Sequence, residues 1–428
     1  MFTKLDIVDY VNTIKSSSDS EKRKLVQVHK DIHKIIVNYC LKNDIIVSDP
    51  ETLVNRDRSK KLSFDLYSPY PFKHAILLSN ELINITKFVE MRTCISRKEF
   101  IIYVNLIQLI KMYDLPYIKK EGKDVKFINT LSCSVGDVKL QFLSPEIELM
   151  DIYHKLYIPT QVEEWGALLQ LEEELFSCYQ TYMTPKKTKR SSYTNKSLIK
   201  LKQNILNNWC SISHTSDIIV IGYWAYMLYD SKNEQFKNER LQVISANTID
   251  NDILTLETLV TNYSHAAYEG KPSYQISYTQ QNVNIPKDFR IQKHAISIIK
   301  DGKNITIMEI YNSSSFELIP FVDSTILGKK TTDGVKVGNP FVLLRYYLID
   351  YWLLHYITAL GKMPLNVCDD KLGNIMKCIE YMRTKINMGF GKNYIGQFID
   401  EQIADKLRRL DTERHAPYLP FVKKRTFS

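Results

Sequence analysis

The order of apolar segments in residues 41–150 constrains the fold more than any other feature of the chain. Apolar runs at residues 45–47 and 62–66 predict two short strands, residues 72–88 have helical periodicity, and residues 100–110 form another apolar run. A strand, a turn, a strand, a helix and a strand in this order predict a small mixed sheet with helices on one side. The fold class that we expect is therefore α/β (α+β).

A second region repeats this pattern after a helical connector. Residues 218–221 form an apolar strand that a helix-like segment follows, and further strands are predicted as far as residue 311. Because each region begins with an apolar strand after a helical segment, we expect two consecutive α/β units. We divide the chain into an N-terminal helical segment (1–40), a first α/β domain (41–150), a helical connector with a basic linker (151–212), a second α/β domain (213–390) and a tail (391–428).

Composition excludes several classes of protein. The 428 residues are 44% hydrophobic and 25% charged, which is typical of a soluble globular protein. The longest apolar run, residues 218–229, is too short to span a bilayer, so we expect no membrane association. Seven cysteines without C-x-x-C or Cys/His ligand spacing predict reduced thiols and no zinc site. Residues near Met1 lack the pattern of a signal peptide, and we expect an intracellular protein.

The positive charge of the chain makes RNA a candidate partner. The net charge is +9, and a polyanion is the kind of partner that such a charge attracts. A Pro-, Ser- and Thr-rich stretch at residues 184–195 carries a cluster of cations that is suited to phosphate contacts. The alternative for this stretch is a solvated loop without a partner. The cations of this candidate RNA-binding linker are Lys186, Lys187, Lys189 and Arg190, and a second candidate at the tail consists of Lys423, Lys424 and Arg425.

Several strings of residues resemble one family of enzymes. The strings are SFDLYSP (63–69) with YDLP (113–116) after it, SPEIELMDIYHKLY (144–157) and IVIGYWAYMLY (219–229). In this order they resemble the poly(A) polymerase catalytic subunits of large cytoplasmic DNA viruses. The resemblance implies two consecutive nucleotidyltransferase-like units, of which the second is degenerate even in the working enzymes.

The resemblance also implies a metal-dependent chemistry. In the family, two glycines at the first strand–helix turn let the backbone approach the triphosphate of ATP. An Asp-x-Asp pair on the next strand places two carboxylates on one face of the sheet. Together with a carboxylate on a later strand they bind two Mg²⁺ ions, which activate the 3′ hydroxyl of RNA and stabilise the leaving pyrophosphate.

The chain departs from this pattern at the first two positions. Ser48 and Asp49 stand where the glycines are expected, and the carboxylate of Asp49 would face phosphate. Pro50 removes an amide donor from the same turn. On the next strand Ser63 replaces the first carboxylate of the pair, so that Asp65 alone remains.

The third carboxylate is missing as well. Counting forward from residues 99–100 puts Asn105 at its position, while anchoring on the YDLP string puts Lys111 there. A site with the single carboxylate of Asp65 would bind Mg²⁺ weakly, because affinity depends on the number of charged ligands. We therefore expect no cofactor and no catalysis. The alternative is that Asp49 or Asp114 replaces a lost ligand, in which case Mg²⁺ is the cofactor.

The second unit offers no replacement for the lost site. Gly222 is the only glycine of its strand–helix turn, bulky Tyr223 follows it, and the strand at residues 241–245 has no acidic pair. We interpret this part of the unit as a buried strand and helix. The aromatic residues between Phe341 and Tyr356 have helical spacing, which predicts either core packing or a subunit interface.

The function that we expect is that of an inactive, regulatory or scaffolding subunit related to viral poly(A) polymerases, acting in mRNA 3′-end polyadenylation. One alternative is an active poly(A) polymerase that adds AMP from ATP to RNA 3′ ends with relocated metal ligands. Another is a structural component of the virion or of a transcription complex. The resemblance implies a homodimer or a heterodimer with an active paralogue. It also implies the host cytoplasm, at the viral factory, with packaging in the virion as a further destination.

Overall fold

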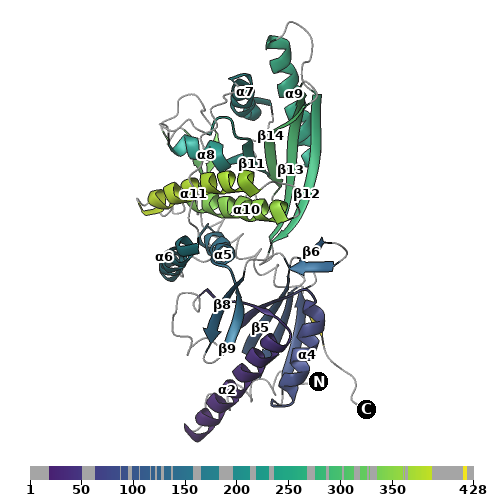
Figure 1. Cartoon of the computed structure of the whole chain (residues 1–428), viewed down its shortest axis with the longest axis vertical. Coiled ribbons are helices and arrows are strands. Elements are labelled where there is room, and N and C mark those ends of the chain that lie inside the picture. The colour runs from purple at the N-terminus through teal and green to yellow at the C-terminus, as the bar shows by residue number, and fades with distance from the viewer. Residues whose placement is uncertain are drawn as a thin grey trace. The chain divides into compact units, whose positions relative to one another are not determined.

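The computed structural model of the chain contains two compact units (Figure 1). The N-terminal unit lies within Met1–Tyr117, Ile128–Ser144 and His415–Ser428, and the C-terminal unit lies within Ile118–Phe127 and Pro145–Arg414. The finer domain boundaries predicted above stay predictions. The structure describes residues 19–50, 63–86, 88–94, 99–105, 107–115, 117–120, 123–126, 130–135, 138–157, 165–182, 196–212, 218–230, 236–267, 275–285, 289–300, 303–312, 319–324, 327, 335–359, 361, 365–387 and 418–421.

The N-terminal unit is built on an eight-stranded mixed sheet with the strand order β17-β3-β4-β5-β2-β1-β9-β8. Its elements are α2 (Asp19–Lys42), β1 (Ile46–Ser48), β2 (Phe64–Ser68), α4 (Pro71–Ile83), β3 (Val89–Cys94), β4 (Glu99–Val104), β5 (Ile107–Asp114), β8 (Thr130–Val135), β9 (Val138–Leu143) and β17 (Tyr418–Phe421). A separate hairpin consists of β6 (Tyr117–Lys120) and β7 (Lys123–Lys126).

The core of the N-terminal unit lies between its sheet and the helices α2 and α4. Alternate residues of β2 point to the face of the sheet that the helices cover. Phe64 and Leu66 belong to the core cluster with Ile36 of α2 and Leu78 of α4. Asp65, between the two, points to the opposite face. The sequence pattern of a small mixed sheet with helices on one side is confirmed here.

The C-terminal unit is built on a seven-stranded mixed sheet with the strand order β12-β13-β14-β11-β10-β16-β15. Its strands are β10 (Ile218–Ile221), β11 (Leu241–Ser245), β12 (Gln275–Ile285), β13 (Phe289–Lys300), β14 (Lys303–Asn312), β15 (Phe321–Asp323) and β16 (Lys336–Gly338). Its helices are α5 (Pro145–Tyr157), α6 (Trp165–Tyr182), α7 (Lys196–Ile212), α8 (Gly222–Tyr229), α9 (Ile249–Ala267), α10 (Pro340–Ala359) and α11 (Leu365–Asn387). None of the helices described in either unit is long and apolar enough to cross a membrane.

The two sheets have the same topology strand for strand. The order β3-β4-β5-β2-β1-β9-β8 of one sheet corresponds to β12-β13-β14-β11-β10-β16-β15 of the other. Each pairing also has the same direction: β2–β5 and β11–β14 are parallel, as are β1–β9 and β10–β16, and the other pairs of both series are antiparallel. The predicted duplication is therefore confirmed at the level of strand order.

An irregularity in the ladder is duplicated too. The register shifts between Ile102 and Tyr103 where β4 pairs with β5, and between Ile296 and Ser297 where β13 pairs with β14. β-bulges bend a strand and are common beside functional sites. Because the two shifts occur at corresponding places, they fix the residue-by-residue correspondence of the two units.

Proline residues start three of the helices. The first residues of α4, α5 and α10 are Pro71, Pro145 and Pro340. Proline is suited to this position, because an N–H group there would have no partner within the helix. At α10 the side chain of Asn339 caps the helix, since its Oδ1 accepts a hydrogen bond of 2.9 Å from the amide of Val342.

One expectation from the sequence was wrong, and one element was not predicted. The apolar run at residues 100–110 is not one strand, because the chain turns at Asn105, whose φ of 50° is left-handed, and continues as β5. Asparagine adopts this conformation more readily than most residues. Helix α9 was not predicted from the sequence.

Candidate functional site

The sequence motif around Asp65 lies at the centre of the N-terminal sheet. Asp65 pairs with Ser48 of β1 on one side and with Lys111 of β5 on the other. Directly paired residues of adjacent strands point to the same face of a sheet. The structure therefore brings Ser48, Asp65 and Lys111 together on the face opposite to the helices.

Two further predicted positions lie elsewhere. Ser63 precedes β2 and is exposed, and Asn105 occupies the turn between β4 and β5. Of the two positions that the sequence left open for the third carboxylate, Lys111 is the one beside Asp65. A lysine at this position puts a positive charge where a metal ligand is needed.

The ammonium group of Lys111 has a carboxylate close by. Its Nζ lies 4.0 Å from Oε1 of Glu99 on β4, and the side chain of Glu99 is only 3% exposed while that of Lys111 is 32% exposed. The pair spans two neighbouring strands on the Asp65 face. The positive charge of Lys111 thus lies close to two carboxylates, Asp65 and Glu99.

Of the two carboxylates that could replace a missing ligand, Asp114 does not join this arrangement. Asp114 pairs with Ser68, an odd number of residues along β2 from Asp65, so it belongs to the opposite face. Asp49 follows β1 directly and is buried. Among the residues that the structure describes, no group of three or more His, Cys, Asp or Glu side chains could hold a metal ion. The residues present do not fit a site for two Mg²⁺ ions.

The C-terminal unit has a corresponding site with different residues. Gln242 of β11 pairs with Ile221 of β10 and with Glu309 of β14, as Asp65 pairs with Ser48 and Lys111. By this correspondence Arg240, Gln242 and Glu309 stand at the positions of Ser63, Asp65 and Lys111, and Gly222 stands at that of Asp49. Each unit has one carboxylate among the first three of these positions, Asp65 in one unit and Glu309 in the other.

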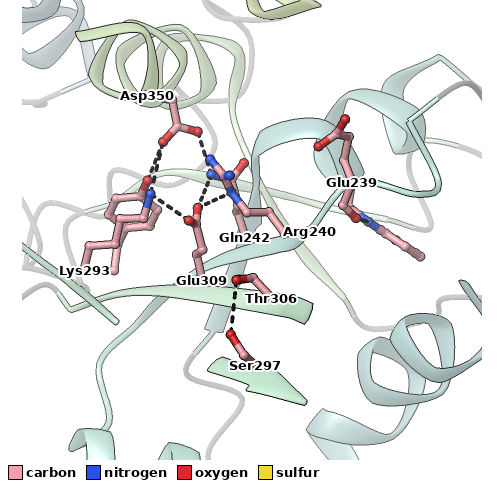
Figure 2. A network of polar contacts seen from close by, with 10 residues as sticks. Glu239, Arg240, Gln242, Lys293, Ser297, Thr306, Glu309 and Asp350 are labelled. Atoms are coloured by element: carbon pink, nitrogen blue, oxygen red, sulfur yellow. Dashed lines mark hydrogen bonds and ion pairs between the residues drawn. The ribbon is translucent and has the colours of Figure 1, made fainter. Parts of the chain in front are cut away.

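Glu309 is the centre of a buried ionic network in this second site (Figure 2). It forms ion pairs with Nε of Arg240 and, at 2.8 Å, with Nζ of Lys293 of β13. Nε2 of Gln242 donates a hydrogen bond of 2.9 Å to the Oε2 atom of Glu309. The carboxylate therefore has a donor for each of its oxygens, which is what a buried charge requires.

Asp350 completes the network from helix α10, as Figure 2 shows. Its Oδ2 accepts a hydrogen bond of 2.6 Å from Gln242, and its Oδ1 accepts one of 2.6 Å from the hydroxyl of Tyr311. Nζ of Lys293 lies 3.8 Å from Oδ1 of Asp350. Two cations, Arg240 and Lys293, thus face two carboxylates, and their formal charges cancel within the network.

The network shifts the pKa values of its members. Burial alone would raise the pKa of Glu309, but Arg240 and Lys293 outweigh it and hold the pKa below the ordinary value. Burial likewise opposes the charge of Arg240, and Glu309 and Asp350 raise its pKa nevertheless. The pKa of Tyr311 is raised well above its ordinary value by burial and by the charge of Asp350, so that its hydroxyl remains a donor.

The two units carry the same ion pair with opposite signs. Glu99 and Lys111 of the N-terminal unit correspond in register to Lys293 and Glu309 of the C-terminal unit. In the N-terminal unit the carboxylate, Glu99, lies on β4. In the C-terminal unit the carboxylate, Glu309, lies on β14, which corresponds to β5. Both pairs join corresponding strands next to the duplicated bulge. Each sheet therefore has one carboxylate and one cation at this place, with their positions exchanged.

Gly222 allows the C-terminal network to close. Its φ is +66°, and a Cβ atom at this position would lie 1.8 Å from Oε1 of Gln242. The carbonyl oxygen of Gly222 also accepts a hydrogen bond of 2.8 Å from the hydroxyl of Tyr347. The glycine that the sequence offered as a remnant of a phosphate-binding turn therefore makes room for the side chain of Gln242. The expected buried strand and helix are present as β10 and α8.

The remaining predicted sites fall into two groups. The candidate RNA-binding linker and the basic tail lie outside the described residues, and their role stays a prediction. The aromatic helix is described: Phe341, Tyr347, Tyr351 and Trp352 are buried in the chain itself. Of the two interpretations of this helix, core packing is correct, and these side chains are not free to form a subunit interface.

Sequence reasoning missed the network of Arg240, Gln242, Lys293, Glu309 and Asp350. A signal was present, since Glu309 is the one charge in the apolar middle of β14 and Lys293 lies in the middle of β13. Charged residues are rarely buried unless they are paired. Two such charges of opposite sign on neighbouring strands indicate an ion pair.

Comparison with known proteins identifies the fold. No family model matches the sequence. An uncharacterized protein of African swine fever virus, from a tick isolate from Malawi, is 23% identical over 433 residues, which cover 96% of this chain and 97% of that protein. Its counterpart from a tick isolate from Pretoriuskop in South Africa is 23% identical over 445 residues, with the same coverage.

Among solved structures, the polyadenylate synthase of Megavirus is similar to this chain with a TM-score of 0.59 and 15% identity, over 90% of this chain and 77% of that one. The predicted fold of two nucleotidyltransferase-like units is confirmed.

The first prediction concerns Gly222. Gly222→Ala should lower the free energy of unfolding by more than the ~1–2 kcal/mol that a left-handed backbone costs an alanine, because the new Cβ also displaces Gln242 from its hydrogen bonds. Gly361→Ala is the matched control, since Gly361 has a φ of +70° and no atom within 4 Å of an added Cβ. Chemical denaturation of both variants measures the difference, and equal losses would show that Gln242 is not held in place.

The second prediction concerns the pH dependence of the network. Glu309→Gln leaves Arg240 and Lys293 without their carboxylate and should destabilise the chain by about 3–5 kcal/mol at neutral pH. Because the pKa of Glu309 is lower in the folded chain than its ordinary value of 4.5, its stabilisation is complete above that pH and is lost as the pH falls through the folded value. The difference in unfolding free energy between wild type and variant should therefore shrink in acid. Exposed Glu257→Gln serves as the control; a pH-independent difference for Glu309→Gln would contradict the ion pairing.

The third prediction concerns Lys111. Lys111→Asp places a second carboxylate beside Asp65 and near Glu99, so the variant should bind Mn²⁺ or Mg²⁺ and unfold at a higher temperature when the ion is added. The gain should be about 1.4 kcal/mol with the ion at ten times its dissociation constant. Wild type and Lys139→Asp, an exposed change on β9, should not respond. An equal response of the wild type would mean that its site already binds metal.

Proposed function

We propose that this chain is a viral protein related to poly(A) polymerases that has lost nucleotidyl transfer and acts as a regulatory or scaffolding subunit in mRNA 3′-end polyadenylation. The observation that carries the proposal is the pairing of Asp65 with Ser48 and Lys111. A nucleotidyltransferase needs carboxylates around its two metal ions. Here a lysine and a serine flank the single acid on the strand.

The C-terminal unit supports the same proposal. Its corresponding positions are filled by Arg240, Gln242 and Glu309, whose charges are neutralised within a buried network. The carboxylate of Glu309, which Arg240 and Lys293 already hold, is not available to an incoming metal ion. Among the described residues, neither unit has the group of carboxylates that a metal site needs, while both units have the same strand order.

The viral assignment rests on the comparisons. The Megavirus protein of similar structure is a polyadenylate synthase, and the relatives of similar sequence belong to African swine fever virus. From this likeness we infer a role at the mRNA 3′ end in the host cytoplasm. RNA would bind through Lys186, Lys187, Lys189 and Arg190, and an active poly(A) polymerase is the partner that a scaffold of this kind would serve.

The active alternative requires a relocated carboxylate. Asp114 lies on the face of the sheet opposite to Asp65, which disfavours it as the replacement. Asp49 is the remaining candidate, at the end of β1 beside Ser48. Since one additional carboxylate still leaves the lysine at the third position, we favour the inactive subunit.

The fourth prediction tests the loss of activity. The purified chain, incubated with an RNA primer, ATP and either Mg²⁺ or Mn²⁺, should not extend the primer, because Asp65 alone remains of the three expected carboxylates and cannot by itself hold the two metal ions. A working poly(A) polymerase added to the same primer is the positive control. Extension by the purified chain that disappears in Asp65→Ala would establish an active enzyme and refute the proposal.

A further inference from the structure

Lys202 of α7 is a buried lysine outside the network of Glu309. It is only 2% exposed, and a lysine is rarely buried to this degree unless its ammonium group is paired. Its Nζ donates a hydrogen bond to each of three consecutive backbone carbonyl oxygens, those of Lys237 (3.1 Å), Asn238 (2.8 Å) and Glu239 (2.7 Å). An ammonium group has three N–H donors. Each donor of Lys202 therefore has an acceptor of its own.

The three acceptors belong to a turn that other contacts hold in shape. The amide of Glu239 donates a hydrogen bond of 2.9 Å to the carbonyl oxygen of Phe236, which closes the turn. The ring of Phe236 is buried against Tyr223 and Tyr226 of α8, with ring centroids 4.8 Å and 5.4 Å apart. The conformation of this turn therefore does not depend on Lys202 alone.

Trp224 of α8 lies on another side of the ammonium group. Nζ of Lys202 is 5.8 Å from the centroid of the indole ring, within the range of a cation–π interaction. Nε1 of the same ring donates a hydrogen bond of 3.0 Å to the carbonyl oxygen of Glu239, which fixes the ring beside this acceptor. Carbonyl oxygens and the face of an aromatic ring both attract a cation. The arrangement is therefore suited to a small cation with N–H donors.

The lysine keeps its charge in this environment. Burial lowers the pKa of Lys202 to about 8, and the carboxylate of Glu239 opposes this shift. Since this value is above neutral pH, the side chain is still protonated there. All of its donors are then present for the carbonyl oxygens.

We propose that the carbonyl oxygens of residues 237–239 and the ring of Trp224 form a binding site for an ammonium group, and that the chain fills this site with Lys202. Glu239 directly precedes Arg240, whose guanidinium pairs with Glu309, so an ammonium group in the site fixes the segment that enters β11. α7 begins at the residue after the basic stretch 184–195, so Lys202 also anchors the helix to which the candidate RNA-binding linker is joined. A free ammonium ion or a small primary amine has the same kind of donors and should occupy the site when the side chain is shortened.

Chemical rescue of Lys202→Ala tests the proposal. In sodium chloride this variant should unfold at a lower denaturant concentration than the wild type, because the carbonyl oxygens lose their donors. Ammonium chloride or methylammonium chloride should restore part of the lost stability, with the concentration dependence of binding at one site. Tetramethylammonium chloride at the same concentration should not, because its cation has no N–H group. Lys200→Ala, at an exposed position of the same helix, is the matched control and should respond equally to ammonium and tetramethylammonium.

Two further measurements apply even where Lys202→Ala folds poorly. Lys202→Met fills the space with an uncharged side chain, so ammonium and tetramethylammonium salts should affect its stability equally. In the folded wild type, Lys202 should react with an acylating reagent more slowly than exposed Lys200, as measured by mass spectrometry. The proposal is overturned if ammonium stabilises Lys202→Ala no more than tetramethylammonium does. It is also overturned if ammonium rescues Lys202→Met to the same extent, or if Lys202 is acylated as fast as Lys200.

Discussion

Parallel pairing of the two central strands is the constraint on which both sites depend. β2 lies beside β5 and β11 beside β14, so that one side chain from each strand must share a small area on the same face. In a metal-dependent nucleotidyltransferase this closeness is useful, because two Mg²⁺ ions neutralise the carboxylates. A cationic side chain can balance a carboxylate at the same place, and each unit has such a cation. It is Lys111 in the N-terminal unit, and Lys293 with Arg240 in the C-terminal one.

The buried network is not a simple gain in stability. Bringing two cations and two carboxylates out of water costs several kcal/mol per ion, and apolar residues of similar volume would often be as stable. We interpret the network as the counterpart of the Asp65 site, since the strand geometry of the two sites is the same while their side chains differ. The swapped signs of Glu99–Lys111 and Lys293–Glu309 favour this interpretation, since independent stabilising pairs would not be expected at corresponding positions next to the same bulge.

Local patterns in the sequence were sufficient to predict much of the fold. The apolar strand at residues 218–221, the helix after Pro71 and the aromatic helix after Pro340 depend on periodicity and on proline at the first helical position, which are local properties. The turn at Asn105 was missed because apolar residues flank it on both sides. Asp65 and Lys111 could be named from the motif, but their pairing required the register of β2 and β5.

The network lay beyond sequence reasoning for a different reason. Gln242 and Asp350 are 108 residues apart, and only the packing of α10 near β11 brings them within 2.6 Å. Buried charges among apolar residues could be noticed in the sequence, but their partners could not be identified. A side chain such as Gln242, which joins Glu309 to Asp350, has no local signature at all.

The prediction that the chain binds no metal ion is tested most directly by electron paramagnetic resonance of Mn²⁺ during titration with the wild-type chain. If side-chain cations take the place of the metal ions, adding the chain should not lower the signal of free Mn²⁺. The same should hold in the presence of ATP, where a solution of Mn²⁺ and ATP without the chain gives the reference signal. A stoichiometric loss of the signal that Asp65→Ala abolishes would contradict this conclusion and restore Asp65 as a ligand of an active metal site.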